Sequence, residues 1–152
     1  MNYRRATIDD IETLIELRKK QLIAEGIEPQ IDIDSELHLF FKNKLSDDSL
    51  IQWVVEDNKE VIACGAIIFY EFPPSYTNKS GKKAYVTNMY TKEEYRGNGI
   101  ATRLLTKLVE EAKALGVMKI WLSASKLGRP VYEKFGFNAS DEWLELEAEK
   151  VF

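Results

Sequence analysis

Residues 94–105 read EYRGNGIATRLL and place two glycines directly before a regular helical pattern. Apolar residues recur at helical spacing from Ile100 to Leu115, which predicts an amphipathic helix. Glycine costs stability at a helix entrance and is a weaker cap than Ser, Thr or Asp. Gly97 and Gly99 therefore indicate a turn in which the backbone has to stay uncovered.

A strand, a glycine-rich turn and a helix in succession form a device that holds phosphate. The first amide groups of a helix lack internal acceptors, and the helix dipole adds partial positive charge there. Arg96 would add a fixed charge, and Thr102 a hydroxyl one turn into the helix. The alternative is an ordinary turn without a ligand. The dinucleotide fingerprint G-x-G-x-x-G and the P-loop are both absent. If the turn binds phosphate, the ligand is therefore a nucleotide of another kind.

The chain around this turn alternates strand and helix patterns. Strands are expected at residues 3–6, 50–56, 60–70, 83–91 and 117–125, and again in the tail from residue 137, where 142–146 is the clearest. Helices are expected from a Thr7/Asp10 capping box to about Ile23, from Asp34 or Ser35 to about Leu45, from Ile100 to about Leu115, and over 129–135. The order β-α-α-β-β-β-α-β-α-β-(β) predicts an α/β fold with helices on both faces of a mixed sheet.

Composition narrows the class of protein. The 152 residues are 45% hydrophobic and 30% charged, and no repeat or linker divides them, so one domain over 1–152 is expected. A net charge of −4 without a basic patch argues against nucleic acid as a partner. No segment approaches membrane-spanning length, and the N-terminus lacks an apolar signal region, which predicts a cytoplasmic protein without membrane contact. Cys64, the single cysteine, lies in an apolar run without metal-ligand spacing around it, so no metal is expected.

Three segments in order resemble the GNAT superfamily of N-acetyltransferases. Residues 96–101, RGNGIA, fit the signature Arg/Gln-x-x-Gly-x-Gly/Ala, the strand YVTNMYT precedes them, and GRPVYEKFGF resembles a later family segment. The resemblance covers nearly the whole chain, although the part before Leu50 matches only in helix count. It implies a single-domain, mostly antiparallel mixed sheet, with acetyl-CoA as co-substrate and its pyrophosphate on the turn.

The same resemblance implies roles for individual residues. The pyrophosphate turn would comprise Arg96, Gly97, Asn98, Gly99, Ile100, Ala101 and Thr102. A bulge would splay the preceding strand, so that the backbone of Met89, Tyr90 and Thr91 follows the pantetheine arm and amides near 88–90 stabilise an oxyanion. Ser125 would either bond the pantetheine arm or cap a helix.

Tyr132 is the expected proton donor to the leaving thiolate, because it occupies the tyrosine of the family's Tyr-Glu-Lys segment. A phenol with a pKa near ~10 stays protonated at neutral pH and can donate. The alternative is an amphipathic tyrosine packed beside Val131 and Phe135.

The general base is left open between His38, Glu71 and a chain of water molecules. A set of acidic side chains expected near the cleft would suit a cationic amine: Glu25, Glu28, Asp32, Asp34 and Glu71. The prediction is therefore transfer of an acetyl group to a primary amine of a small molecule or peptide. The competing hypothesis is a CoA-binding sensor or regulatory module without catalysis. The resemblance leaves a homodimer open.

Overall fold

The structure is a computed structural model that describes residues 1–151. Its strands are β1 (Asn2–Arg5), β2 (Leu50–Asp57), β3 (Glu60–Glu71), β4 (Lys82–Thr91) and β5 (Ile120–Trp121). Its helices are α1 (Ile11–Ala24), α2 (Asp34–Ser46), α3 (Ile100–Ala114) and α4 (Arg129–Phe135), with short 3-10 turns at Ile8–Asp10, Glu93–Tyr95 and Ala148–Lys150.

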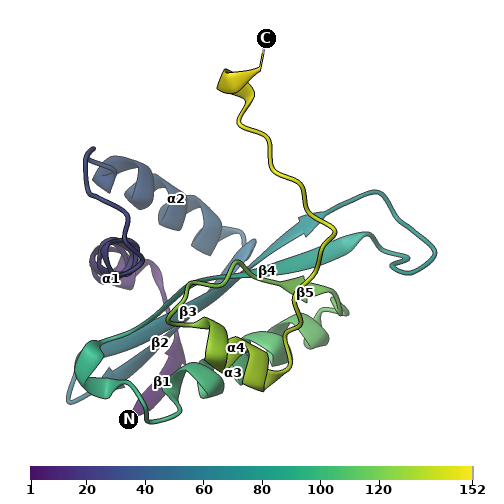
Figure 1. Cartoon of the computed structure of the whole chain (residues 1–152). Helices are drawn as coiled ribbons and strands as arrows, with labels where there is room; N and C mark the ends of the chain where they lie inside the picture. Colours follow the sequence, from purple (N-terminus) through teal and green to yellow (C-terminus); the bar gives the residue numbers. More distant parts are fainter. Residues whose placement is uncertain (152) are drawn as a thin grey trace.

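The strands form one sheet in the order β1-β2-β3-β4-β5. The first four strands pair antiparallel with their neighbours, whereas β4 and β5 are parallel. Helices α1 and α2 lie on one face of the sheet, and α3 and α4 lie on the other (Figure 1). The predicted mixed, mostly antiparallel sheet covered on both faces is confirmed.

The first helix begins where the sequence indicates. The Thr7 amide donates to Asp10 Oδ2 at 2.8 Å, and the Thr7 hydroxyl accepts from the first turn, which completes the predicted capping box. The guanidinium of Arg4 donates to both Asp10 oxygens at 2.8 and 2.9 Å, and this hydrogen-bonded pair holds the Asp10 pKa below its usual value. Strand β1 and helix α1 are thereby joined through one charged pair.

Strand β3 is the centre of the core, because both of its faces are covered. Cys64 and Ala66 pack toward a cluster that includes Leu14 of α1 and Phe41 of α2. On the opposite face Ile67 packs in the cluster that contains Leu105 and Leu108 of α3. A strand buried on both faces reads as a continuous apolar run, as VIACGAII does.

Two strand predictions are wrong. Pairing at β5 covers only residues 120–121 instead of 117–125, and no strand forms at 142–146 or elsewhere after residue 137 in the part of the chain described. Residues 138–151, the C-terminal arm, leave the body and stay exposed throughout (Figure 1). Alternation of apolar and polar residues makes a strand possible, but a strand forms only beside a partner, and this arm has none.

Candidate functional site

A bulge in β4 shapes the site. Cys64 pairs with Tyr90, and Ala66 pairs with Thr87. The interval between the two pairs is two residues on β3 and three on β4, so β4 carries one extra residue. Asn88 has a φ of 54°, in the left-handed region that Asn tolerates better than most residues. Its buried amide donates to Gln52 Oε1 at 3.3 Å, and its carbonyl accepts from the Cys64 thiol at 3.2 Å. The bulge that the resemblance implied is present and is held from β2 and β3.

Gly65 makes room for the bulge on the neighbouring strand. A Cβ atom on residue 65 would lie 2.5 Å from Sδ of Met89, a distance that no side chain could accept without displacing the methionine. Met89 therefore lies over the bare backbone of Gly65 and points into the core. The backbone of residue 89 is left facing the gap between β4 and β5.

A cleft of about 980 Å³ opens where β4 and β5 separate. Only Ala84 and Tyr85 pair with β5, so the later part of β4 has an unpaired edge. The walls come from this edge, the turn before α3, the first turn of α3, residues 122–128, α4 and the C-terminal end of α1. Of the residues predicted for the site, the lining includes Met89, Tyr90, Thr91, Arg96, Gly97, Gly99, Ile100, Ala101, Thr102, Ser125 and Tyr132.

The first turn of α3 presents uncapped amides to this cleft. Gly99 is the N-cap, with φ 78° and no side-chain cap, and Gly97 has φ 81°. A Cβ atom on either glycine would meet no atom within 4 Å, so both face open space. Asn98 does not line the cleft and instead donates from Nδ2 to the Tyr95 carbonyl at 3.0 Å, which closes the turn. Free amides at a helix N-terminus suit an anionic ligand.

Three cationic side chains line the cleft. Arg96 donates from Nε to the Thr91 carbonyl at 2.9 Å, and its guanidinium lies 5.6 Å from the Tyr90 ring centroid. Arg18 and Lys126 also line the cleft. In a chain with a net charge of −4, these cations favour an anion locally.

Tyr132 of α4 lines the cleft at its junction with α1. Burial raises the pKa of Tyr132 to about 12, and the nearby Glu25 carboxylate and Tyr85 add to this shift. The phenol is therefore protonated at any physiological pH. Ser125 contributes to its position, since the Ser125 hydroxyl accepts from the Gly128 amide at 3.1 Å just before α4. Ser125 thus caps the turn into α4 and also borders the cleft.

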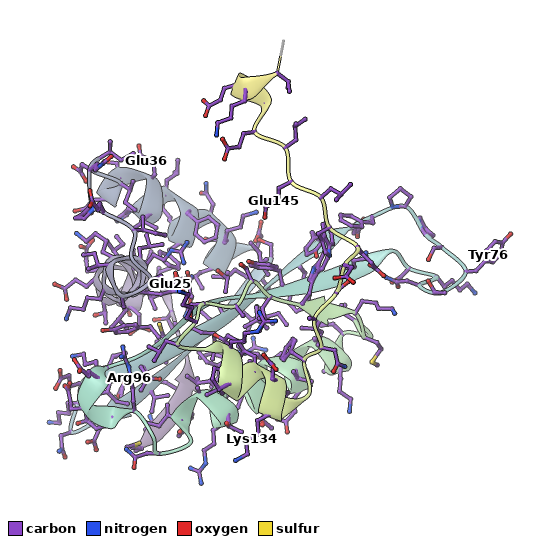
Figure 2. All side chains as sticks on the ribbon, in the orientation of Figure 1. Glu25, Glu36, Tyr76, Arg96, Lys134 and Glu145 are labelled. Atoms are coloured by element: carbon purple, nitrogen blue, oxygen red, sulfur yellow. The ribbon has the colours of Figure 1, made fainter. Side chains whose placement is uncertain are left out.

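Glu25 is the single carboxylate among the described residues that line the cleft. It lies at the end of α1, which Figure 2 shows together with Arg96 of the opposite wall. Gln21 donates from Nε2 to Glu25 at 3.3 Å and accepts from Arg18 at 3.3 Å. A chain of three polar side chains therefore follows one face of α1 and ends in a negative charge near Tyr132.

A bulged strand, a splayed neighbour and an uncapped glycine turn together occur in the sequence region that the family model recognises. The model of the "Acetyltransferase (GNAT) family" matches residues 11–137. The chain belongs to the acetyltransferase (GNAT) family.

Similar proteins agree with this assignment. A crystal structure of a predicted acetyltransferase with acetyl-CoA from Clostridium acetobutylicum is 57% identical, covers 99% of this chain and 97% of that chain, and has a TM-score of 0.96. Glucosamine 6-phosphate N-acetyltransferase of Trypanosoma brucei brucei is 28% identical over 74 residues, 49% of this chain and 50% of that protein. L-ornithine N5-acetyltransferase NATA1 of Arabidopsis thaliana is 26% identical over 102 residues, 65% of this chain and 44% of that protein. The chain spans about half the length of these two curated relatives.

The structure separates this GNAT chain's two candidate bases from the cleft. His38 is exposed on α2, with Nε2 3.9 Å from Glu12, and neither His38 nor Glu71 is among the cleft residues. The acidic residues predicted beside the cleft are likewise absent from its lining, apart from Glu25. Cys64 lies beneath the bulge, and burial raises the pKa of its thiol to about 12, so a thiolate nucleophile is ruled out at neutral pH.

Sequence reasoning missed several residues that shape the site. Gly128 allows the Tyr132 ring to pack against its backbone, and Gly65 does the same for Met89. Tyr85 and Gln21 border the cleft from β4 and α1. The glycines were visible as isolated glycines in a strand and before a proline, but nothing local indicated which side chain each would accommodate.

No helix in the described chain is long and apolar enough to cross a membrane, and residues 1–151 hold no cluster of three potential metal ligands.

Proposed function

We propose that this protein transfers the acetyl group of acetyl-CoA directly to a primary amine of a small molecule or peptide. The observation that carries the proposal is that Tyr132, a protonated phenol, lines the same cleft as the uncapped amides of α3. Membership of the acetyltransferase family and the similar protein solved with acetyl-CoA support it. The names of both curated relatives describe acetylation of an amine.

The two ends of the cleft suit the two parts of CoA. The amides of the first turn of α3, with Arg96 beside them, would hold the pyrophosphate. The unpaired edge of β4 at Met89, Tyr90 and Thr91 would bond the amides of the pantetheine arm as an edge strand bonds a neighbour. A CoA molecule bound in this way directs its thioester toward Tyr132.

The reaction then needs three events at one carbon. The neutral amine forms the new C–N bond, and the carbonyl oxygen becomes an oxyanion that backbone amides at residues 88–90 stabilise. The C–S bond breaks, and the leaving sulfur takes the proton of Tyr132. The amine nitrogen releases one proton to water, and the Tyr132 phenolate takes a proton back from water. The products are an acetylated amine and CoA thiol, so no covalent intermediate on the protein is required.

Glu25 would supply attraction for the acceptor. A primary amine titrates near ~10.4 and reaches the protein as a cation. Glu25 carries the negative charge on the acceptor side, and the bond from Gln21 limits its movement. The proposed acceptor is therefore a cationic amine, bound beside Glu25 and deprotonated through water.

Calorimetric titration with acetyl-CoA and a thiol-release assay over a panel of amines test this function. Saturable binding together with release of CoA thiol is expected. Tyr132→Phe should retain binding and lower kcat about a hundredfold, the scale of a lost general acid. Binding without thiol release for any amine would favour the non-catalytic module, and absence of binding would refute the proposal.

A further inference from the structure

Helix α1 brings to the cleft a cation that no carboxylate of the described chain neutralises. Arg18 is half-buried and lines the cleft. Arg4, Arg5 and Arg129 each pair with a carboxylate, whereas Arg18 forms no ion pair among the described residues. Acidic side chains outnumber basic ones in this chain, 25 to 21. A half-buried guanidinium that still lacks a counter-ion indicates a place for an anionic group of a ligand.

Gln21 fixes the position of Arg18 relative to Glu25. The buried side-chain amide of Gln21 accepts from Arg18 Nη1 at 3.3 Å and donates to Glu25 Oε1 at 3.3 Å. One amide group separates these two bonds, so Arg18 Nη1 and Glu25 Oε1 lie no more than roughly 9 Å apart. Helix α1 therefore presents a positive and a negative group to the cleft at a limited separation.

Both charged groups lie near the atoms that are proposed to react. Burial raises the pKa of Tyr132, and the Glu25 carboxylate adds to this shift because it is close. Burial also raises the pKa of Cys64, and the Arg18 guanidinium opposes that shift. The Cys64 thiol donates to the Asn88 carbonyl at the bulge, at 3.2 Å. The two charges therefore lie on α1 beside the stretch between the bulge and Tyr132, where the thioester would be.

The phosphates of CoA already have a site on another wall of the cleft. The uncapped amides of α3 and the side chain of Arg96 provide it. Figure 2 shows Arg96 apart from Glu25 at the end of α1. The charge of Arg18 is thus left for the second substrate.

We propose that the acceptor is a small amine that also carries an anionic group, which Arg18 binds while Glu25 binds the amine. This inference rests on the proposed acetyl transfer and narrows its acceptor class. The anionic group is a carboxylate or a phosphate, since a guanidinium binds either through two parallel N–H donors. Diamines and polyamines are disfavoured because their second cation would meet Arg18, and a plain alkylamine would leave Arg18 unpaired.

A matched set of amines tests the acceptor class. β-Alanine carries a carboxylate, phosphoethanolamine a phosphate, n-propylamine no second charge, and putrescine a second cation. At least one of the two anionic amines should exceed n-propylamine about tenfold in kcat/KM, measured by thiol release, and the better of the two identifies the anion. Dissociation constants in the complex with CoA give the same comparison without turnover. Equal values for all four amines, or a preference for n-propylamine or putrescine, would overturn the proposal.

Substitutions at Arg18 assign the preference to this residue. Arg18→Gln should abolish the preference for an anionic amine while acetyl-CoA affinity stays unchanged, and Arg18→Lys should restore part of it. Arg18→Glu should shift the preference toward putrescine. Lys20→Gln is the matched control, because it removes the same charge from an exposed position of α1 outside the cleft. Partial unfolding would lower the rates for all amines alike, so it cannot change their ratio.

The proposed function and this inference fail in different ways. Absence of thiol release with every amine would refute the transfer, while dissociation constants that favour an anionic amine through Arg18 would still support the ligand class. Thiol release with a preference that survives in Arg18→Gln would leave the transfer intact and overturn the role of Arg18. Loss of acetyl-CoA affinity in Arg18→Gln would place Arg18 on CoA instead and would overturn it as well.

Discussion

A Cβ atom on Gly128 would lie 2.8 Å from Cε2 of Tyr132, because the phenol ring fills the space beside this glycine. The two residues are one helical turn apart, and the Tyr132 amide donates to the Gly128 carbonyl at 3.1 Å. The position of the proposed proton donor is therefore set by the absence of a side chain at residue 128.

Gly128→Ala should lower kcat about tenfold while acetyl-CoA affinity stays close to wild type. The added methyl group pushes the ring away from the leaving sulfur, and general-acid catalysis is sensitive to donor distance. When Gly128→Ala and Tyr132→Phe are combined, their losses in kcat should not multiply, because both substitutions act through the Tyr132 hydroxyl. Multiplicative losses in the double variant would show that Gly128 acts by another route.

Gly99→Ala should weaken acetyl-CoA binding at least about tenfold, since a methyl group would project into open space above the helix amides. Gly116→Ala is the matched control: Gly116 has φ 75°, close to the 78° of Gly99, and also faces open space, but it lies at the far end of α3. Both variants should lose about 1 kcal/mol of folding stability through left-handed strain. Equal CoA affinity of the two variants would contradict a phosphate site at Gly99.

Glu25→Gln should raise the KM for the amine, with acetyl-CoA affinity unchanged. The substitution removes the negative charge on the acceptor side but keeps the shape and the contact with Gln21. It should also lower the pKa of Tyr132, because the Glu25 carboxylate contributes to raising that pKa. Steady-state kinetics at two salt concentrations measure the effect, with Glu28→Gln as the control outside the cleft. An unchanged KM would remove Glu25 from acceptor binding.

The free energy of unfolding should decline in alkali partly through Cys64. Burial raises the pKa of this thiol from 9.0 to about 12, so its contribution is complete below pH 9 and is lost as pH rises toward 12. Urea unfolding between about pH 7 and pH 11 should show Cys64→Ala declining less steeply than wild type. Burial also raises the pKa of Tyr70, from 10.0 to about 12, so Tyr70 affects stability only above pH 10. Tyr70→Phe should therefore change only the later part of the curve. Parallel curves for wild type and Cys64→Ala would contradict the burial of the thiol.

Local signals predicted the parts of the fold that local physics decides. The helix over 129–135 begins with Pro130 in its first turn and ends at Gly136, and α4 has those bounds. The glycine turn and α3 were predictable, because positive φ angles favour glycine and a helix repeats apolar residues at a regular spacing. The bulge at Asn88 was expected only through the family resemblance, since its supports, Gln52 and Cys64, come from other strands.

What the sequence could not predict depends on distant partners. Apolar and polar residues alternate in the tail as they do in a strand, yet residues 142–146 form no strand and stay exposed, although the edge of β5 is open. Five acidic residues were candidates for the cleft, and only the packing of α1 against the sheet separates Glu25 from the others. His38 and Glu12 lie together on the outer side of α1 and α2, a placement that a helical pattern alone does not give.

The two-residue ladder between β4 and β5 has a consequence for the lifetime of the protein. Because β5 and α4 are joined to the rest of the sheet by so few backbone bonds, this half of the cleft should open at a lower free energy than the antiparallel strands. A ligand that bridges the two strands replaces the missing bonds and stabilises the native state by mass action. The rates of hydrogen exchange and proteolysis near β5 should then fall as the concentration of that ligand rises. The co-substrate level in the cell would thereby set how long the folded chain survives.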